Sequence, residues 1–146
     1  MELHHLGFCV RDNLQESIEE WEYLGYEKMV EIGRHPTKNM DIVFMKNGGY
    51  RIEMMSPSDP TKDSPVAQPL KATKAQIMNY HCGYSTDDTA KSMRWLMGEN
   101  YAIASNVTPG WLPCVQQFKL ANMRNFDTGM GLFELLGTYS SEEFVE

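Results

Sequence analysis

Two histidines and two glutamates recur at matching places along the chain. His5 precedes Glu53 by 48 positions, and His81 precedes Glu134 by 53 positions. Each histidine lies in a short strand-like run, and each glutamate lies in an apolar one. Two imidazole nitrogens and two carboxylates suit Zn, Ni, Co, Mn or Fe. Such a set leaves two positions of an octahedral ion open for water or substrate oxygens, as a catalytic metal site requires.

Taken singly, each of these residues also has an ordinary structural interpretation. A single histidine at the start of a strand usually bonds to backbone groups, and a buried carboxylate needs either a partner or a solvent-facing position. Their joint occurrence at equivalent places favours metal ligation. The neighbouring His4 is expected on the opposite face of its strand from His5. His35 precedes a proline and is expected in a surface loop.

The elements that must position these residues occur twice, in the order β-α-β-β-β. The first half predicts a helix over 14–25 and strands over 3–10, 26–33, 40–46 and 50–55. The second half predicts a helix over 90–98 and strands over 78–85, 101–107, 114–123 and 130–137. Trp21 aligns with Trp95 and Gly25 with Gly98, so the two halves are two copies of one plan. If the first and last strands of each copy are neighbours, its His and Glu converge on one face.

Local signals mark the ends of several of these elements. Asn13 or Asp12 can cap the first helix, and Asp87 or Asp88 can cap the second. The Asn-Gly-Gly turn at 47–49 joins two strands of the first half as a hairpin.

The segment between the two copies has a different composition. Residues 57–76 hold four of the seven prolines, which argues against regular structure apart from a helical turn near 66–72. We therefore expect a single domain over 1–146. Its parts are a first module at 1–56, a linker at 57–76, a second module at 77–138 and a tail at 139–146.

Charge and cysteine content exclude several classes of protein. The chain has 13 basic and 20 acidic residues and a formal charge of -7, which disfavours nucleic acid as a partner. No apolar run reaches the roughly 18 residues of a membrane span, and no signal-peptide pattern is present, so we expect a cytoplasmic protein. The odd number of cysteines (Cys9, Cys82 and Cys114) predicts buried small hydrophobes in a reducing compartment rather than disulfides.

The motifs together resemble the vicinal oxygen chelate (glyoxalase/bleomycin resistance) superfamily. They are HLG on the first strand, NGGYRIE at the first acid, YHCGYSTDD at the second histidine and GLFELLG at the end. The likeness runs from Met1 to about Gly137 and is greatest to bacterial glyoxalase I-like proteins (lactoylglutathione lyases) and to methylmalonyl-CoA epimerases. It implies an α+β fold in which two βαβββ modules form a cleft.

The resemblance also implies an activity and a set of roles. The family's metal ligands fall on His5, Glu53, His81 and Glu134, with Ni, Co, Zn or Mn as the ion. A glyoxalase I-type lyase would convert a 2-oxoaldehyde–thiol hemithioacetal into a 2-hydroxyacyl thioester through a metal-stabilised enediolate. Glu134 and Glu53 would shuttle the proton, while the two histidines would act as ligands only. A homodimer is implied as well.

Four other functions stay open on the same fold. An epimerase would invert the carbon next to a CoA thioester, but Glu53 looks more like glyoxalase because epimerases often carry glutamine there. Tyr80, where epimerases commonly have a further histidine, and the unusual segment 110–120 leave the substrate undecided. A drug-binding resistance protein needs no complete ligand set. Dioxygenases and fosfomycin-modifying transferases use two histidines and one glutamate, so Glu53 counts against both.

Overall fold

The computed structural model describes residues 1–113, 119–125 and 132–137. The chain divides into two compact units, each treated separately below. The first unit comprises residues 5–80 and 112–114, and the second comprises 1–4, 81–111 and 115–146. The predicted tail at 139–146, Cys114 and the beginning of the predicted strand at 114–123 lie outside the described residues.

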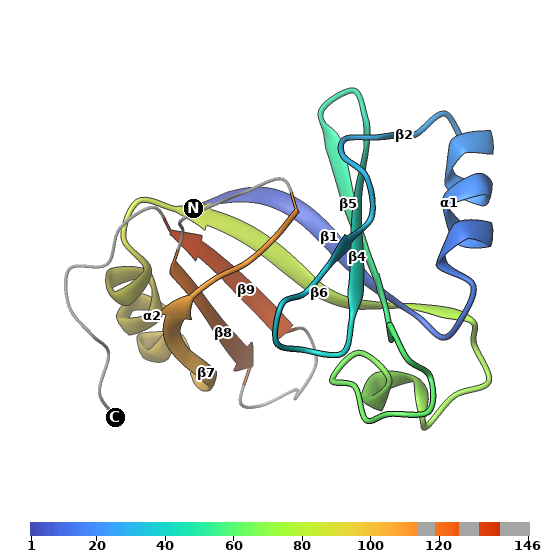
Figure 1. The fold of residues 1–146 in the computed structure, drawn as a ribbon. Helices are drawn as coiled ribbons and strands as arrows, with labels where there is room; N and C mark the ends of the chain where they lie inside the picture. The colour runs from blue at the N-terminus through green and yellow to red at the C-terminus, as the bar shows by residue number, and fades with distance from the viewer. Residues whose placement is uncertain (114–118, 126–131, 138–146) are drawn as a thin grey trace. The chain divides into compact units, whose positions relative to one another are not determined.

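The first unit contains a sheet in the order β2-β4-β5-β1 (Figure 1). The short strand β3 also pairs with β4. Within this sheet β1 runs parallel to β5, and β4 and β5 form an antiparallel hairpin. Its elements are β1 (Glu2–Val10, which begins in the second unit), α1 (Leu14–Tyr23), β2 (Glu27–Lys28), β3 (Gly33–Arg34), β4 (Asp41–Asn47), β5 (Tyr50–Ser56) and the 3-10 turn η1 (Gln68–Leu70).

The second unit repeats this plan, with a sheet in the order β6-β9-β8-β7. Here β6 runs parallel to β9, and β8 is antiparallel to both of its neighbours. Its elements are β6 (Ile77–Thr86, whose first residues belong to the first unit), α2 (Thr89–Gly98), β7 (Tyr101–Pro109), β8 (Lys119–Asn125) and β9 (Leu132–Gly137). The repeated βαβββ order is therefore confirmed, as is the α+β class.

The strand predicted over 26–33 is wrong as a single element. It forms only the two-residue strands β2 and β3, both paired with β4 at the edge of the sheet. Lys28 pairs with Met45 and Gly33 with Ile42. The edge segment therefore advances by five residues over a stretch in which β4 advances by only three. The two extra residues must leave the ladder, as in a bulge, and they interrupt the strand.

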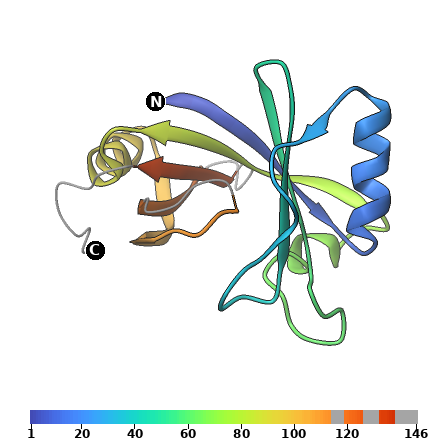
Figure 2. The same ribbon diagram turned by 45° about the horizontal axis from the view of Figure 1, so that its top comes forward.

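Each helix covers one face of its own sheet because its apolar residues recur at helical spacing (Figure 2). Asn13 caps α1 by accepting the backbone N–H of Glu16 at 3.2 Å, and Asp88 caps α2 through Lys91 in the same way. The core beneath α1 comprises Val10, Leu14, Ile18, Val43, Met45, Ile52 and Met54. The core beneath α2 comprises Met93, Leu96, Ala121, Met123 and Leu135.

Residues 57–76 pack onto the first unit. The predicted helical turn is present as η1, whose Leu70 is buried together with Val66. The side-chain amide of Asn39 donates to the carbonyl of Asp59 at 2.9 Å and accepts that residue's N–H at 2.9 Å. These contacts fix a proline-rich segment that has little regular structure of its own.

Arg11 anchors the end of the same segment. Its guanidinium donates to the carbonyls of Leu70 at 2.8 Å, Thr73 at 2.7 Å and Ala75 at 3.2 Å. We expect Arg11→Met to destabilise the protein by about 2 kcal/mol, because three carbonyls lose a charged donor. Urea unfolding measures this change. Arg34→Met is the matched control, since the Arg34 side chain is exposed and its ion pair with Asp41 is screened by solvent, so its loss should cost much less. Equal losses in the two variants would contradict an anchoring role for Arg11.

Candidate metal centre

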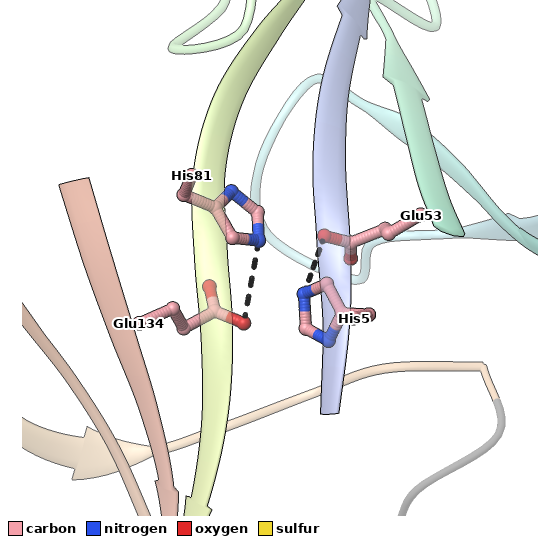
Figure 3. Close-up of side chains that lie close together, drawn as sticks. All are labelled: His5, Glu53, His81 and Glu134. Carbon is pink, nitrogen blue, oxygen red and sulfur yellow. Dashed lines mark ion pairs between the residues drawn. The ribbon is translucent and has the colours of Figure 1, made fainter. Parts of the chain in front are cut away.

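The first unit brings His5 together with Glu53 across the parallel pair β1–β5. Glu53 stands opposite Gly7 in the register, and His5 lies two residues before Gly7 on the same face of the strand. The His5 Nε2 atom lies 3.3 Å from Glu53 Oε2 (Figure 3). Both residues are only 1% exposed.

An aromatic ring packs against the histidine of this pair. Phe44 stands opposite Glu53 on the other side, across the β4–β5 hairpin. Its ring meets the imidazole of His5 edge-on, with centroids 5.2 Å apart. Phe44 was not among the predicted site residues. The sequence does carry a signal for Phe44, because the two-residue Gly48–Gly49 loop fixes the register of the hairpin. That register places Phe44 opposite Glu53.

The second unit repeats the arrangement across the parallel pair β6–β9. Glu134 stands opposite Gly83, two residues after His81 on the same face. The His81 Nε2 atom lies 3.8 Å from Glu134 Oε1 (Figure 3). His81 is 2% exposed and Glu134 is 9% exposed, so the second carboxylate is the more accessible of the two. In place of Phe44, this unit has Asn122 opposite its glutamate.

A glycine therefore faces the glutamate in both pairs. Neither Gly7 nor Gly83 has a side chain that could lie beside the carboxylate on this face. The glutamate side chain in each pair can therefore extend toward the histidine that lies two residues before the glycine. We expect Gly83→Val to weaken divalent-metal binding at least tenfold, because the added branch would separate His81 from Glu134. Isothermal titration measures the affinity. Ser85→Val, at the next position on the same face, is the matched control and should keep the wild-type affinity.

The four side chains together offer the donors that could hold a metal ion, two imidazoles and two carboxylates. In each unit the pair lies on the sheet face opposite the helix, because Ile52, Met54 and Leu135 of the alternate positions belong to the cores beneath α1 and α2. The two other histidines have other surroundings. His4 is half-buried, and His35 accepts the backbone N–H groups of Thr37 and Lys38.

Cys9 lies on the same face as His5 and is fully buried. Burial, reinforced by the negative charge of Glu53, raises the pKa of its thiol to about 12. We therefore expect almost no thiolate at pH 8 and very slow reaction with a disulfide reagent in the folded protein. The measurement uses a Cys82→Ser, Cys114→Ser variant, in which Cys9 is the remaining thiol. Rapid labelling without denaturant would contradict this, while rapid labelling in urea is the positive control.

Residues 4–112 match the family model described as the glyoxalase/bleomycin resistance protein/dioxygenase superfamily. The chain belongs to this superfamily. The matched range includes His5, Glu53 and His81, whereas Glu134 lies beyond it. Members of the superfamily commonly bind divalent metals, which agrees with the donors present in the two pairs.

Several solved structures share the superfamily fold at low sequence identity. A hypothetical protein from Bacillus halodurans C-125 is 16% identical, with a TM-score of 0.75 and coverage of 99% of this chain and 97% of that one. Methylmalonyl-CoA epimerase from Mycobacterium tuberculosis is 20% identical, with a TM-score of 0.72 and coverage of 93% and 87%. An epimerase solved in complex with methylmalonyl-CoA and NH4+ is 16% identical, with a TM-score of 0.72 and coverage of 99% and 98%.

No curated protein gives a significant match to this superfamily member. Within the described part of the chain, none of the helices is long and apolar enough to cross a membrane.

Proposed function

We propose that the protein is a metal-dependent enzyme of the glyoxalase I type, which moves a proton at a carbon next to a carbonyl. The observation that supports it is the repeated pair: each unit buries one His and one Glu within 3.8 Å or less of each other, on the face away from its helix. A buried acid in one unit is an ordinary structural feature. The same acid at the same register position in both units favours a shared chemical role.

In this proposal His5, Glu53, His81 and Glu134 together hold one divalent ion, of which Ni, Co, Zn and Mn are the candidates. Two carboxylates balance the charge of the ion and suit Mn, and neutral imidazoles suit Zn and Ni. When bound, the ion supplies Lewis-acid stabilisation of the negative charge that develops on the substrate's carbonyl oxygen.

The chain's own carboxylates carry the proton. Glu134 is the better candidate to remove it from the substrate carbon, because its side chain is the more exposed of the two. Glu134, now a neutral acid, returns the proton to the neighbouring carbon either directly or by passing it to Glu53, so both carboxylates end ionised as they began. His5 and His81 hold their positions as ligands and take no part in the transfer.

Two arginines lie on the same sheet faces as the glutamates. Arg51 is two residues before Glu53 on β5, and Arg124 pairs with Leu132, two residues before Glu134 on β9. Both side chains are exposed. They favour a substrate that carries an anionic group, such as the adduct of an acidic thiol or an acyl-CoA.

An epimerase acting on an acyl-CoA is the second candidate. Several solved neighbours of this fold are methylmalonyl-CoA epimerases, and the same two carboxylates would serve as its acid and base. The two candidates differ in substrate and share the proton chemistry.

A substrate screen with metal-loaded protein tests the proposal. Protein loaded separately with Ni, Co, Zn or Mn is assayed with methylglyoxal plus each of several thiols, and with methylmalonyl-CoA. We expect 2-hydroxyacyl thioester from at least one thiol adduct. Exchange of the α-hydrogen of methylmalonyl-CoA with solvent, without thioester formation, would select the epimerase. Metal binding without either reaction would favour a binding protein.

We also propose a homodimer. Analytical ultracentrifugation of the purified protein tests this, and a single species of monomer mass would contradict it.

A further inference from the structure

The second unit has a cavity that the proposed chemistry does not use. Its volume is about 640 Å³, and it lies beside α2. Tyr84 follows Gly83 on β6, and Phe133 precedes Glu134 on β9, so alternation places both rings on the helix side of the sheet. The lining residues used below are Tyr84, Trp95, Leu96, Glu99, Tyr101 and Phe133.

The aromatic wall of this cavity is held in place by its own contacts. The ring of Phe133 stacks on Tyr84, with centroids 5.4 Å apart and planes inclined by 19°. The ring of Tyr101 meets Phe133 edge-on at 5.2 Å. Trp95 stands at the side on α2 with 57% of its surface exposed. A wall of mutually packed rings loses little freedom when a ligand binds.

The charged side chains of this cavity and of the one beside it are mostly acidic. Glu99 belongs to its lining, and a second cavity that shares Met1 and Trp95 with the first is lined by Asp87, Asp88 and Lys91. Among the described side chains that line the two cavities, three are carboxylates and one, that of Lys91, is an ammonium. Aromatic faces attract cations because their quadrupoles are negative at the face.

We propose that the cavity formed by Tyr84, Trp95, Tyr101 and Phe133 is a binding site for an organic cation that carries apolar groups, such as an alkylated ammonium. The rings contact the alkyl groups and the positive charge together. Glu99 in the lining supplies the opposite charge, and Asp87 and Asp88 of the adjoining cavity add to it. A phosphate or carboxylate ligand would meet repulsion here. The site lies on the opposite sheet face from His81 and Glu134, so its occupancy is separable from the proton chemistry.

Choline and its neutral isostere 3,3-dimethylbutan-1-ol form the probe pair, because they differ in charge and hardly in shape. Dissociation constants are measured by ligand-observed NMR at low ionic strength with the full chain. We expect choline to bind about fivefold more tightly than the alcohol. Trp95→Ala should weaken choline binding at least fivefold, and Glu99→Gln should weaken it about threefold while leaving the alcohol unchanged.

The matched control is Tyr23→Ala, which removes a 91% exposed ring from the first unit and should leave choline binding unchanged. Equal affinity for choline and the alcohol would overturn the proposal, as would unaltered choline binding by Trp95→Ala. A second copy of the chain covering the cavity would also overturn it. In that case choline would not bind, and Trp95→Ala would lower the oligomeric mass in ultracentrifugation.

Discussion

Replacing Glu134 with glutamine should lower kcat by about 10²- to 10⁴-fold, the usual contribution of a general base. The amide keeps the size of the side chain and an oxygen that can ligate, but it cannot accept a proton from carbon. Glu134 has the neighbouring imidazole of His81 at 3.8 Å and a side chain that solvent still reaches. The assay uses whichever substrate the screen identifies, with metal content determined on the same samples.

Two further variants show whether a lower kcat of Glu134→Gln comes from the loss of the base or from a loss of bound metal. Glu20→Gln changes an exposed acid on α1 and should leave both kcat and metal content as in the wild type. Glu53→Gln should lower metal affinity as well as kcat, because it removes charge from the fully buried pair. A Glu134→Gln protein with wild-type kcat and bound metal would remove this residue from the role of base.

Adding a divalent metal should stabilise the folded protein by about 2.7 kcal/mol at a free concentration a hundred times the Kd. Each proposed pair of ligands comes together only in the folded chain, since His5 and Glu53 are 48 positions apart and His81 and Glu134 are 53 apart. We expect His5→Ala and His81→Ala each to abolish this stabilisation. Thermal unfolding with and without Ni, Co, Zn or Mn measures it.

Stoichiometry decides whether the two pairs act as one site. A single ion per chain, lost in either histidine variant, is the expected outcome of isothermal titration. Two ions per chain, one removed by each variant, would mean that each pair binds its own metal. His4→Ala is the control, because His4 neighbours His5 in sequence but is expected on the other face of β1.

Three features of the sequence favour the pairing of each histidine with its glutamate. Alternation assigns the face, the repeat assigns the equivalent positions, and the hairpin turn at 47–49 makes β4 one neighbour of β5. The place of β1 on the other side of β5 had to be assumed, and the structure shows it. The distance between His5 and Glu53 does not follow, because it depends on a parallel register between strands far apart in the chain. That register is set by core packing of Ile52, Met54 and their neighbours beneath α1.

Two other features could not be predicted for the same reason. The segment 26–33 has strand-like composition, and only its pairing with β4 shows that it has two residues too many for one ladder. Arg11 looks like an ordinary residue before a helix cap, yet its three hydrogen bonds reach residues 59 to 64 positions away. Long-range partners of this kind leave no local signal.

The glycines opposite the two glutamates also bear on how such a site could be re-engineered. Gly7 and Gly83 are not donors themselves, so replacing either one changes the spacing of a His–Glu pair without altering the set of ligating groups. Because each glycine serves one unit, the two halves of the donor set can be tuned independently. Alanine at one position and glycine at the other would give an asymmetric set, a route to altered metal preference that leaves every ligand intact.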